Sequence, residues 1–426
     1  MPPGPDALDN PKAFLTSLFD AAVAAADPHV IVPRNLPAPP KGRTVVVGAG
    51  KGAAQLAAAF ESVWDGPLSG AVVTRYGYAV PCERIDVLEA AHPVPDQAGL
   101  EASARLMREV EALGEDDLVV ALICGGGSAL LPAPPEGFAL EDEVALNRAL
   151  LACGAPIAAM NTLRKHFSRI KGGRLALAAA PARVVSLIVS DIPGDDPAQV
   201  ASGPTVPDRS GREEAQRVIA RYRLELPEAV KRFVASEAAA CPDPGDSRFR
   251  RNAVSIIASA RVSLEAAAER AREMGFDAVI LSDAVEGEAR EAGLFHAALA
   301  REVALRNRPF EKPVIILSGG ETTVTLRGDG KGGRNSEFLL SFAQGIEGVE
   351  GIYALAADTD GIDGSEDNAG AFCSGASVTR LRDLGHDPQA MLDANDAWSA
   401  FHALDDLFVP GPTGTNVNDL RAILVI

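Results

Sequence analysis

Two glycine-rich turns each carry a basic residue at the start of a helix-forming stretch. Lys51 stands in "VVVGAGKGAAQLA" (residues 45–57), where an apolar β-like run breaks into glycines before the helix. Arg334 stands in "GDGKGGRNSE" (residues 328–337), where Asn335 or Ser336 is expected to cap the apolar helix that follows. Backbone N–H groups at a helix N-terminus attract anions, and a basic side chain strengthens that attraction. Both turns therefore predict a site for a phosphate or carboxylate group.

The first turn resembles two nucleotide-binding motifs and completes neither. Gly48, Gly50 and Ala53 fit the dinucleotide pattern G-x-G-x-x-[GA]. That pattern also needs an acidic residue near the end of the second strand, where "VVTRYGY" instead has Arg75, which would suit the extra phosphate of NADP. A P-loop needs a hydroxyl residue after the lysine, and Gly52 occupies that position. An NADPH site, another kind of anion site and a solvent-exposed lysine on a tight turn all stay open.

A second glycine cluster ends another apolar run. In "ALICGGGSALLPAPPEG" (121–137), Gly125, Gly126 and Gly127 would let a ligand approach the backbone closely, and Ser128 adds a hydroxyl. A plain turn after a central strand is the alternative. "HPVPD" (92–96) would line the same pocket, although the expected role of its histidine is structural.

The stretch "MNTLRKHFSRIKGGRLA" (160–176) is basic and contains no acidic residue, in a chain of net charge −18. If it forms one helix, Arg164 and Lys171 share a face, while Lys165 and Arg169 share another. A solvated basic face is the alternative, but binding of an anionic substrate or a nucleotide phosphate is favoured.

Acidic residues follow two other strand-like runs. Asp191 and Asp196 lie in "VSDIPGDDPAQVASGPTVPD" (189–208), and Asp360 lies in "AADTDGIDGSEDNAGA" (356–371). Carboxylates at the ends of strands are common metal ligands and general bases in α/β proteins. Turn formation by Asp and Pro would explain the first stretch equally well. The second does not complete a calcium-binding loop.

These residues are expected to be positioned by α/β folding. Apolar runs at Thr44–Val47, Ala71–Thr74, Leu118–Ile123 and Val184–Val189 alternate with helix-like segments, which predicts a parallel sheet. A Pro-, Gly- and Asp-rich stretch at 241–252 precedes a fresh series of strand-like runs. We therefore predict two domains, residues 1–245 and 246–426.

Composition agrees with an α/β enzyme that acts on a small molecule. Of the 426 residues 47% are hydrophobic and only 5% aromatic, as expected of Ala-, Val- and Leu-rich cores. The net charge of −18 disfavours nucleic acid and anionic membranes. Five scattered cysteines and the lack of a visible export signal or apolar span predict reduced thiols and a cytoplasmic location.

Seven motifs in this order resemble the class II glycerate 2-kinases, whose C-terminal half is called the MOFRL domain and whose members have often been labelled hydroxypyruvate reductases. The resemblance rests on "VGAGKGA" (47–53), "CGGGSALL" (124–131), "RKHFSRIKGGRLA" (164–176), "SDIPGDDPAQVASGPT" (190–205), "SGGETTVTL" (318–326), "GGRNSE" (332–337) and "DTDGIDG" (358–364). It covers nearly the whole chain.

This resemblance implies ATP-dependent phosphorylation of D-glycerate at its 2-hydroxyl, giving 2-phosphoglycerate and ADP with Mg²⁺ or another divalent cation. It implies an N-terminal Rossmann-like parallel sheet flanked by helices and a C-terminal α/β MOFRL domain with a mixed sheet. Lys51 and Arg334 would be active-site residues, and the active site would lie in the interdomain cleft.

For a phosphoryl transfer, Lys51 and Arg334 would stabilise the moving phosphoryl group or bind the glycerate carboxylate. Asp191 is the leading candidate for a metal ligand or for the base at the substrate hydroxyl, with Asp196 and Asp360 as further metal candidates. The expected substrate and nucleotide contacts are Gly48, Gly50, Gly125, Gly126, Gly127, Ser128, Arg164, Lys165, Lys171, Gly172, Gly173 and Asn335.

Two other functions remain open at this point. An NADPH-dependent hydroxypyruvate reductase is motivated by Gly48, Gly50, Ala53 and Arg75, although no histidine except His166 suggests a proton donor. A non-catalytic sugar-acid sensor would use the same anion pocket. The expected partners are glycerate and ATP, without nucleic acid or membrane, for a monomer or homodimer.

Overall fold

The computed structural model describes residues 10–426, and within it the chain divides into two compact units. One unit, called here the N-domain, is Pro28–Ile257. The other, called the C-domain, combines Met1–Asp27 with Ala258–Ile426. The two-domain α/β organisation agrees with the prediction, and each domain is described by itself.

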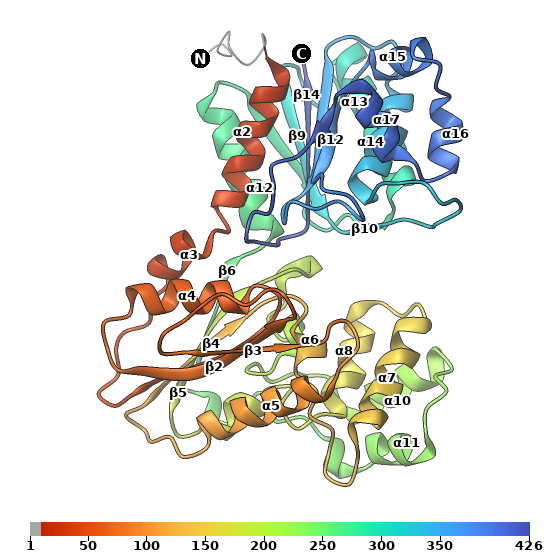
Figure 1. Ribbon diagram of the computed structural model, residues 1–426. Helices are drawn as coiled ribbons and strands as arrows, with labels where there is room; N and C mark the ends of the chain where they lie inside the picture. The colour runs from red at the N-terminus through yellow and green to blue at the C-terminus, as the bar shows by residue number, and fades with distance from the viewer. Residues whose placement is uncertain (1–9) are drawn as a thin grey trace. The chain divides into compact units, whose positions relative to one another are not determined.

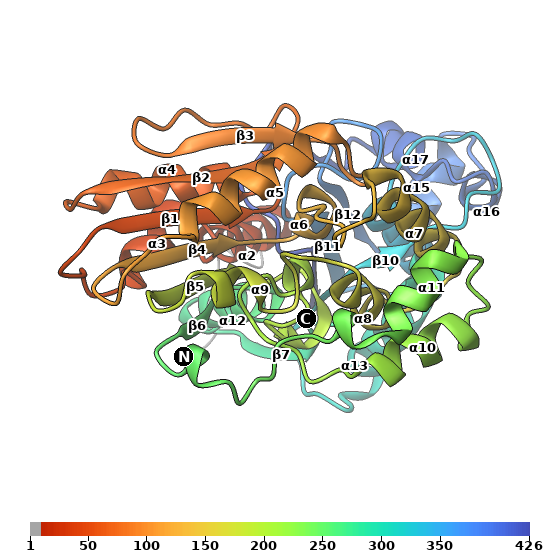
Figure 2. The same cartoon turned by 90° about the horizontal axis from the view of Figure 1, so that it is seen from below.

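The N-domain is built on a six-stranded sheet in the order β3-β2-β1-β4-β5-β6. Figure 2 shows β3, β2, β1, β4 and β5 side by side in this order. The pairs that join β1 to β2 and β4, β2 to β3, and β4 to β5 are all parallel. The strands are β1 (Thr44–Ala49), β2 (Leu68–Arg75), β3 (Asp86–Ala90), β4 (Leu118–Ile123), β5 (Arg183–Val189) and β6 (Ala253–Ala258).

This strand order is the doubly wound order of Rossmann folds. The strands from β1 to β3 are added toward one edge of the sheet, and those from β4 onward are added on the other side of β1, so the order reverses between β1 and β4. Every residue of β1 and β4 is buried, because helices cover both faces. Helix α4 (Ala53–Val63) lies over one face and α5 (Gln97–Val110) over the other (Figure 1). Ligands of such sheets bind at the carboxyl ends of the strands beside the reversal point, which here are the turns after β1 and β4.

The remaining helices of the N-domain extend this core. Phe138, Phe167 and Phe233 meet edge to face in a satellite cluster formed by α7, α8, α10 and α11. The helices are α3 (Pro28–Arg34), α6 (Gly127–Leu130), α7 (Leu140–Ala152), α8 (Ile157–His166), α9 (Arg174–Ala178), α10 (Arg212–Arg221) and α11 (Glu228–Ala235), and short 3₁₀ turns are η1 (Pro193–Asp195), η2 (Val200–Ser202), η3 (Glu237–Ala239) and η4 (Ser247–Phe249).

The basic stretch 160–176 does not form a single helix. Helix α8 ends at His166 and α9 begins at Arg174. Phe167, with φ −119° and ψ 50°, leaves the helical conformation, and Gly172 and Gly173, with φ values of 63° and 86°, are left-handed and separate α8 from α9. Arg164 and Lys171 therefore do not share one helix face.

The C-domain contains a mixed six-stranded sheet in the order β13-β12-β11-β14-β9-β7. Only β7 and β9 pair in parallel, and the central strand β14 runs antiparallel to both of its neighbours. Its strands are β7 (Asp277–Ser282), β9 (Val314–Gly320), β11 (Ile352–Asp358), β12 (Gly370–Ser374), β13 (Leu407–Phe408) and β14 (Asp419–Val425), and β8 (Gly287–Glu288) pairs separately with β10 (Thr322–Thr323). This confirms the expected mixed sheet.

Helices cover both faces of this sheet and give two apolar cores. Helices α2 (Pro11–Ala24) and α12 (Ala260–Glu273) lie together on one face (Figure 1). Five helices contribute to the core on the other face: α13 (Ala289–Arg306), α14 (Arg334–Gly345), α15 (Ser377–Asp383), α16 (Pro388–Asp393) and α17 (Ala397–Leu404).

Helix α2 is the main difference from the predicted domain division. The rings of Phe14 and Phe276 lie 4.7 Å apart at a tilt of 35°, and Phe19 meets Phe408 edge to face at 4.9 Å. The N-terminal helix thus fills the core of the C-domain, and the chain returns to this domain at Ala258, twelve residues beyond the predicted start at 246. Linear order along the chain carries no signal for such a long-range contact.

Within residues 10–426, no single helix is both long and apolar enough to span a membrane, while the bent pair Pro11–Ala24 and Pro28–Arg34 together meets those criteria of length and composition. All five cysteines are free thiols.

Candidate active site

The turn after β1 uses its glycines for close backbone packing. A Cβ at Gly48 would lie 2.5 Å from the carbonyl oxygen of Leu122, and one at Gly50 would lie 2.4 Å from that of Cys124. The N–H groups of this turn are also occupied: Gly50 donates to Val73 O, and Lys51 donates to Gly125 O. Gly48 and Gly50 therefore hold β1 against β4 instead of contacting a ligand, which differs from their predicted role.

The next residue extends this pattern. The Gly52 N–H points at the sulfur of Cys124 at 3.2 Å, and burial raises the pKa of that thiol to about 12. Cys124 is thus a neutral acceptor inside the turn. Because the N–H groups of Gly50, Lys51 and Gly52 already have acceptors, the backbone of this turn cannot bind an anion. Only the side chain of Lys51 is available for that purpose.

The turn after β4 has the opposite character. The N–H groups of Gly125 and Gly126 donate to no acceptor within the described part of the chain. Gly126 has a φ of 80°, and a Cβ there would lie 3.0 Å from Lys51 Cγ and 3.2 Å from His92 Nε2. A Cβ at Gly125 would strike the carboxylate of Asp191. Lys51, His92 and Asp191 thus surround two backbone amides at the reversal point of the sheet.

Ser128 begins a chain of side-chain hydrogen bonds that ends at Arg164. Its hydroxyl lies 2.8 Å from Ser202 Oγ, and Ser202 donates to Asn161 Oδ1 at 3.1 Å, so Ser128 is the donor to Ser202. Arg164 donates to the same amide oxygen at 3.0 Å and to Asn147 Oδ1 at 2.9 Å. These partners are neutral, so they fix the guanidinium without neutralising its charge.

Three positively charged residues, Lys51, Arg75 and Arg164, act on His92 beside this turn. No ion pair is found for Lys51, Arg75 or Arg164 among residues 10–426. Burial, together with the positive charges of Lys51, Arg75 and Arg164, lowers the pKa of His92 to about 4. The side of the turn formed by these residues is therefore electropositive, as an anion site requires.

Lys165 and Lys171 do not join this group. Lys165 is fully buried and donates to Asp208 Oδ2 at 2.8 Å. Lys171 is fully buried and donates to Glu143 Oε1 at 2.7 Å and to Leu131 O at 2.6 Å. Both charges are already paired inside the fold, so the predicted anion contacts do not fit this geometry.

Gly172 and Gly173 support a neighbouring segment. Their N–H groups donate to Ser202 O at 3.0 Å and Gly203 O at 2.7 Å. Ala201 and Ser202 have φ values of 51° and 59°, which are strained for residues with a side chain. The two glycines thus stabilise the strained turn that presents Ser202 to Ser128, and their amides are not free for a phosphate.

The predicted metal ligands do not form one cluster. No group of three or more His, Cys, Asp or Glu side chains arranged to hold a metal ion occurs among the described residues. Asp196 Oδ1 accepts the N–H of Ala198 in its own loop, and Asp360, in the C-domain, accepts the N–H of Ile362. Of the three, only Asp191 lies beside the glycine turn after β4.

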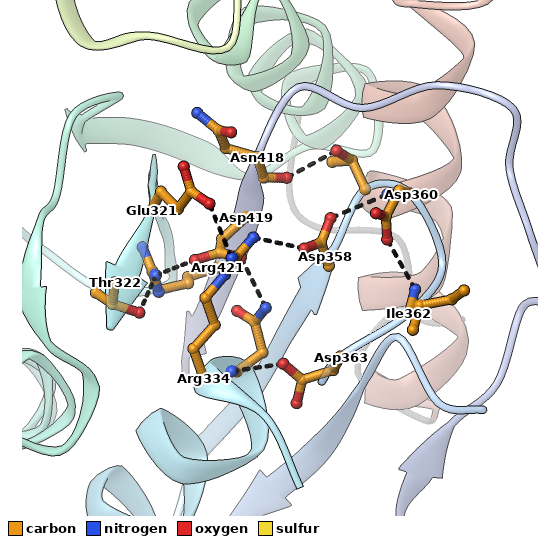
Figure 3. A network of polar contacts seen from close by, with 12 residues as sticks. Glu321, Thr322, Arg334, Asp358, Asp360, Ile362, Asp363, Asn418, Asp419 and Arg421 are labelled. Atoms are coloured by element: carbon orange, nitrogen blue, oxygen red, sulfur yellow. Dashed lines mark hydrogen bonds and ion pairs between the residues drawn. The ribbon is translucent and has the colours of Figure 1, made fainter. Parts of the chain in front are cut away.

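In the C-domain, Arg334 is the first residue of α14 and is held by three carboxylates (Figure 3). Its Nε donates to Asp419 Oδ1 at 2.8 Å, and its two terminal nitrogens donate to Glu321 at 3.0 Å and Asp358 at 2.5 Å. Although burial opposes the charge, these carboxylates raise the pKa of Arg334 above its ordinary value. Burial raises the pKa of Asp358 well above its usual range, with the negative neighbours Asp419 and Asp360 adding to the effect.

The start of α14 is capped by a residue from another segment. Asp363 accepts the N–H groups of Asn335 at 2.9 Å and Ser336 at 2.8 Å, while Gly333 occupies the cap position. This corrects the predicted cap by Asn335 or Ser336. The Asn335 side chain is buried and donates to Asp419 Oδ1 at 2.8 Å, so it belongs to the arginine network and not to an exposed binding surface.

Sequence reasoning missed Asp419 and Arg421, which lie on β14. Arg421 is fully buried and donates to Asp419 Oδ2 at 2.6 Å, whereas its Nε and its other terminal nitrogen have no hydrogen-bond partner among residues 10–426. The mainly apolar run "LRAILVI" (420–426), which follows Asp419, is the sequence signal that could have indicated this strand.

Comparison with known proteins agrees with this architecture. The "Domain of unknown function (DUF4147)" matches residues 14–235, and the MOFRL family matches residues 314–419. The D-glycerate 2-kinase of Thermotoga maritima is 39% identical over 97% of this chain and 98% of its own. A putative hydroxypyruvate reductase of Agrobacterium vitis is 52% identical over 97% of this chain and 94% of its own.

Among solved structures, the crystal structure of glycerate kinase from Thermotoga maritima superposes with a TM-score of 0.89 at 38% identity, covering 99% of this chain and 100% of that one. These matches define a two-domain α/β protein of the glycerate kinase type. The chain belongs to the MOFRL-domain glycerate 2-kinase family.

Proposed function

We propose that this protein is an ATP-dependent kinase that phosphorylates D-glycerate at the 2-hydroxyl, giving 2-phosphoglycerate and ADP. The observation that carries the proposal is the electropositive turn after β4, where free amides of Gly125 and Gly126 lie beside Lys51 and within the influence of Arg164. Phosphoryl transfer depends on positioning and on neutralising charge at the moving group, which is what such an array supplies. The D-glycerate 2-kinase of Thermotoga maritima is similar over almost the full length.

Each residue has a distinct role in this proposal. Lys51 stabilises the phosphoryl group or the glycerate carboxylate, and the amides of Gly125 and Gly126 bind phosphate oxygens. Arg164 contributes long-range positive charge, and Ser128 fixes the turn through Ser202. For Arg334 we propose a separate catalytic role that rests on the family resemblance, because its guanidinium is paired with Asp419, Glu321 and Asp358 within the C-domain.

A divalent cation, when bound, neutralises phosphate charge and orients the phosphates. Mg²⁺ in kinases is usually held by one or two carboxylates together with substrate oxygens, so a preformed cluster is not required. Asp191 fits this demand, because its carboxylate lies where a side chain at Gly125 would otherwise be. We propose Asp191 as the ligand; Asp196 and Asp360 fit less well.

The reductase suggested by the names of the Agrobacterium vitis relatives is disfavoured by the first glycine turn. A dinucleotide pyrophosphate binds to free N–H groups at that helix N-terminus. Here those of Gly50 and Lys51 donate to Val73 and Gly125, and that of Gly52 points at Cys124. His166 is buried and bonded to Thr162 O, so it is not placed as a proton donor.

One pair of assays separates the two activities. Purified protein with ATP, Mg²⁺ and D-glycerate should release ADP, and phosphorus NMR should identify 2-phosphoglycerate as the product. EDTA should abolish turnover and Mg²⁺ should restore it. Oxidation of NADPH by hydroxypyruvate without ATP, or 3-phosphoglycerate as the product, would contradict the proposal.

Variants test the proposed roles of the two basic residues. We expect Lys51→Ala and Arg334→Ala each to lower kcat by about 10²–10³-fold, as for loss of one transition-state contact. If both act in one step, the double variant should lose far less than the product of the two single losses. Lys41→Ala and Arg327→Ala, which change exposed residues, are the matched controls and should keep wild-type kcat.

A further inference from the structure

His92 lies at the proposed site although sequence reasoning assigned it a structural role. It follows β3, the edge strand of the N-domain sheet, yet its ring reaches the glycine turn after β4. A Cβ added at Gly126 would lie 3.2 Å from His92 Nε2 and 3.0 Å from Lys51 Cγ. The imidazole and the lysine side chain therefore flank the same backbone position.

The loop that carries His92 is fixed at its far end. Asp96 caps α5 by accepting the N–H of Gly99 at 3.0 Å, and Tyr76 Oη donates to the same carboxylate at 2.7 Å. Pro93 and Pro95 further restrict the backbone. A histidine held this way presents its ring at a defined place.

The ring nitrogens of His92 have no hydrogen-bond partner within residues 10–426, although the side chain is only partly exposed. The charged groups that act on the ring are Lys51, Arg75 and Arg164, all positive, and they combine with burial to lower the pKa of His92 to about 4. Asp191 is the nearby acidic group, on the Gly125 side of the turn. At neutral pH the imidazole is uncharged, and one of its nitrogens carries a proton.

We propose that His92 is a substrate-contacting residue, whose neutral imidazole donates a hydrogen bond from Nε2 to an anionic oxygen bound beside Lys51. This assignment rests on the proposed kinase function. A neutral donor suits a place where Lys51 and two arginines already supply charge, because it adds direction without adding repulsion between cations. The oxygen belongs either to the glycerate carboxylate or to an ATP phosphate, and both share the chemistry that His92 recognises.

Steady-state kinetics distinguish the two sources of this oxygen. His92→Ala should raise the KM for one substrate at least tenfold, for D-glycerate if the carboxylate is bound and for ATP if a phosphate is bound. His92→Gln, whose amide can donate a similar hydrogen bond, should recover most of the loss. His386→Gln changes an exposed histidine of the C-domain and should behave as wild type.

Proton and carbon NMR of the imidazoles gives a readout besides turnover. The chain has six histidines, so the His92 signals are assigned by their disappearance in His92→Gln. In the free protein these signals should not titrate between pH 8 and pH 5.5, because the neutral form persists. Addition of D-glycerate alone, or of a non-hydrolysable ATP analogue alone, should shift them.

Wild-type ADP release, measured in parallel, separates failure of this inference from failure of the kinase proposal. If the wild type turns over while His92→Ala keeps both KM values, or loses only thermal stability, His92 does not contact substrate. The pH profile of kcat/KM gives a further test. A change of kcat/KM with an apparent pKa near 6.5 in the wild type that is absent from His92→Gln would identify His92 as a proton-transfer group and would overturn its role as a neutral donor. If the wild type shows no glycerate-dependent ADP release, the kinase proposal itself fails.

Discussion

At the scale of single residues, Arg334 in the C-domain binds carboxylates that differ strongly in their exposure to solvent. Asp419 is buried and also pairs with Arg421, which is fully buried and has two nitrogens without hydrogen-bond partners in the described part of the chain. Glu321 contacts the same guanidinium, but its side chain is 55% exposed. Removal of a charge from a buried pair leaves an uncompensated partner, whereas water replaces an exposed one.

We therefore expect Asp419→Asn to lower the free energy of unfolding of the C-domain by about 3–5 kcal/mol. Glu321→Gln should cost less than about 1 kcal/mol. Urea unfolding followed by Trp398 fluorescence measures both, in a Trp64→Phe background that leaves Trp398 as the single tryptophan of the chain. Equal costs for the two variants would show that burial does not govern this network.

At the scale of elements, the turn between β4 and α6 combines backbone freedom with proximity to the proposed site. Gly126 and Gly137 have similar φ values of 80° and 84°. A Cβ at Gly126 would contact Lys51 and His92, whereas one at Gly137 would have no neighbour within 4 Å. The two glycines share the conformational strain of a substitution and differ in what the new methyl group touches.

Gly126→Ala and Gly137→Ala should therefore destabilise the N-domain by a similar amount, about 1 kcal/mol, from the left-handed conformation alone. Only Gly126→Ala should also reduce kcat or raise KM strongly, because its methyl group displaces Lys51 and His92. Kinetic constants and thermal midpoints of both variants provide the measurement. Full activity in Gly126→Ala would argue against a ligand at this turn.

At the scale of the whole molecule, the chain builds its C-domain from both of its ends. Phe19 of α2 is 1% exposed and packs on Phe408, which lies almost 400 residues further along the chain. The doubly wound N-domain is thus inserted between α2 and the rest of the C-domain. Stability of the C-domain must depend on residues near the N-terminus.

Phe19→Ala should lower the free energy of unfolding of the C-domain by about 3–5 kcal/mol, the usual cost of removing a buried phenylalanine. Trp398 belongs to this domain and Trp64 to the N-domain, so single-tryptophan proteins report on each separately. The Trp398 transition should shift while that of Trp64 keeps its midpoint. Leu106→Ala, in the N-domain core, should produce the reverse pattern; a shift of Trp64 alone in Phe19→Ala would contradict the division.

The strands that the sequence predicted well are fully buried ones. Leu118–Ile123 agrees with β4 residue for residue, and the run at Thr44–Val47 is two residues shorter than β1. A strand covered on both faces reads as an unbroken apolar run, which local pattern recognises. The partly exposed β3 lacks such a run, and the sequence indicated it only as the strand that precedes "HPVPD" (92–96), without its bounds.

The sequence by itself determined the α/β class, the two glycine turns with Lys51 and Arg334, and the family resemblance, because these depend on local pattern and on the order of motifs. Only the tertiary structure decided which basic residues are free. Lys165 and Lys171 read like Lys51 in the sequence, but Asp208 and Glu143 neutralise them. Their partners lie 43 and 28 residues away, at distances along the chain where pairing follows from packing and not from spacing.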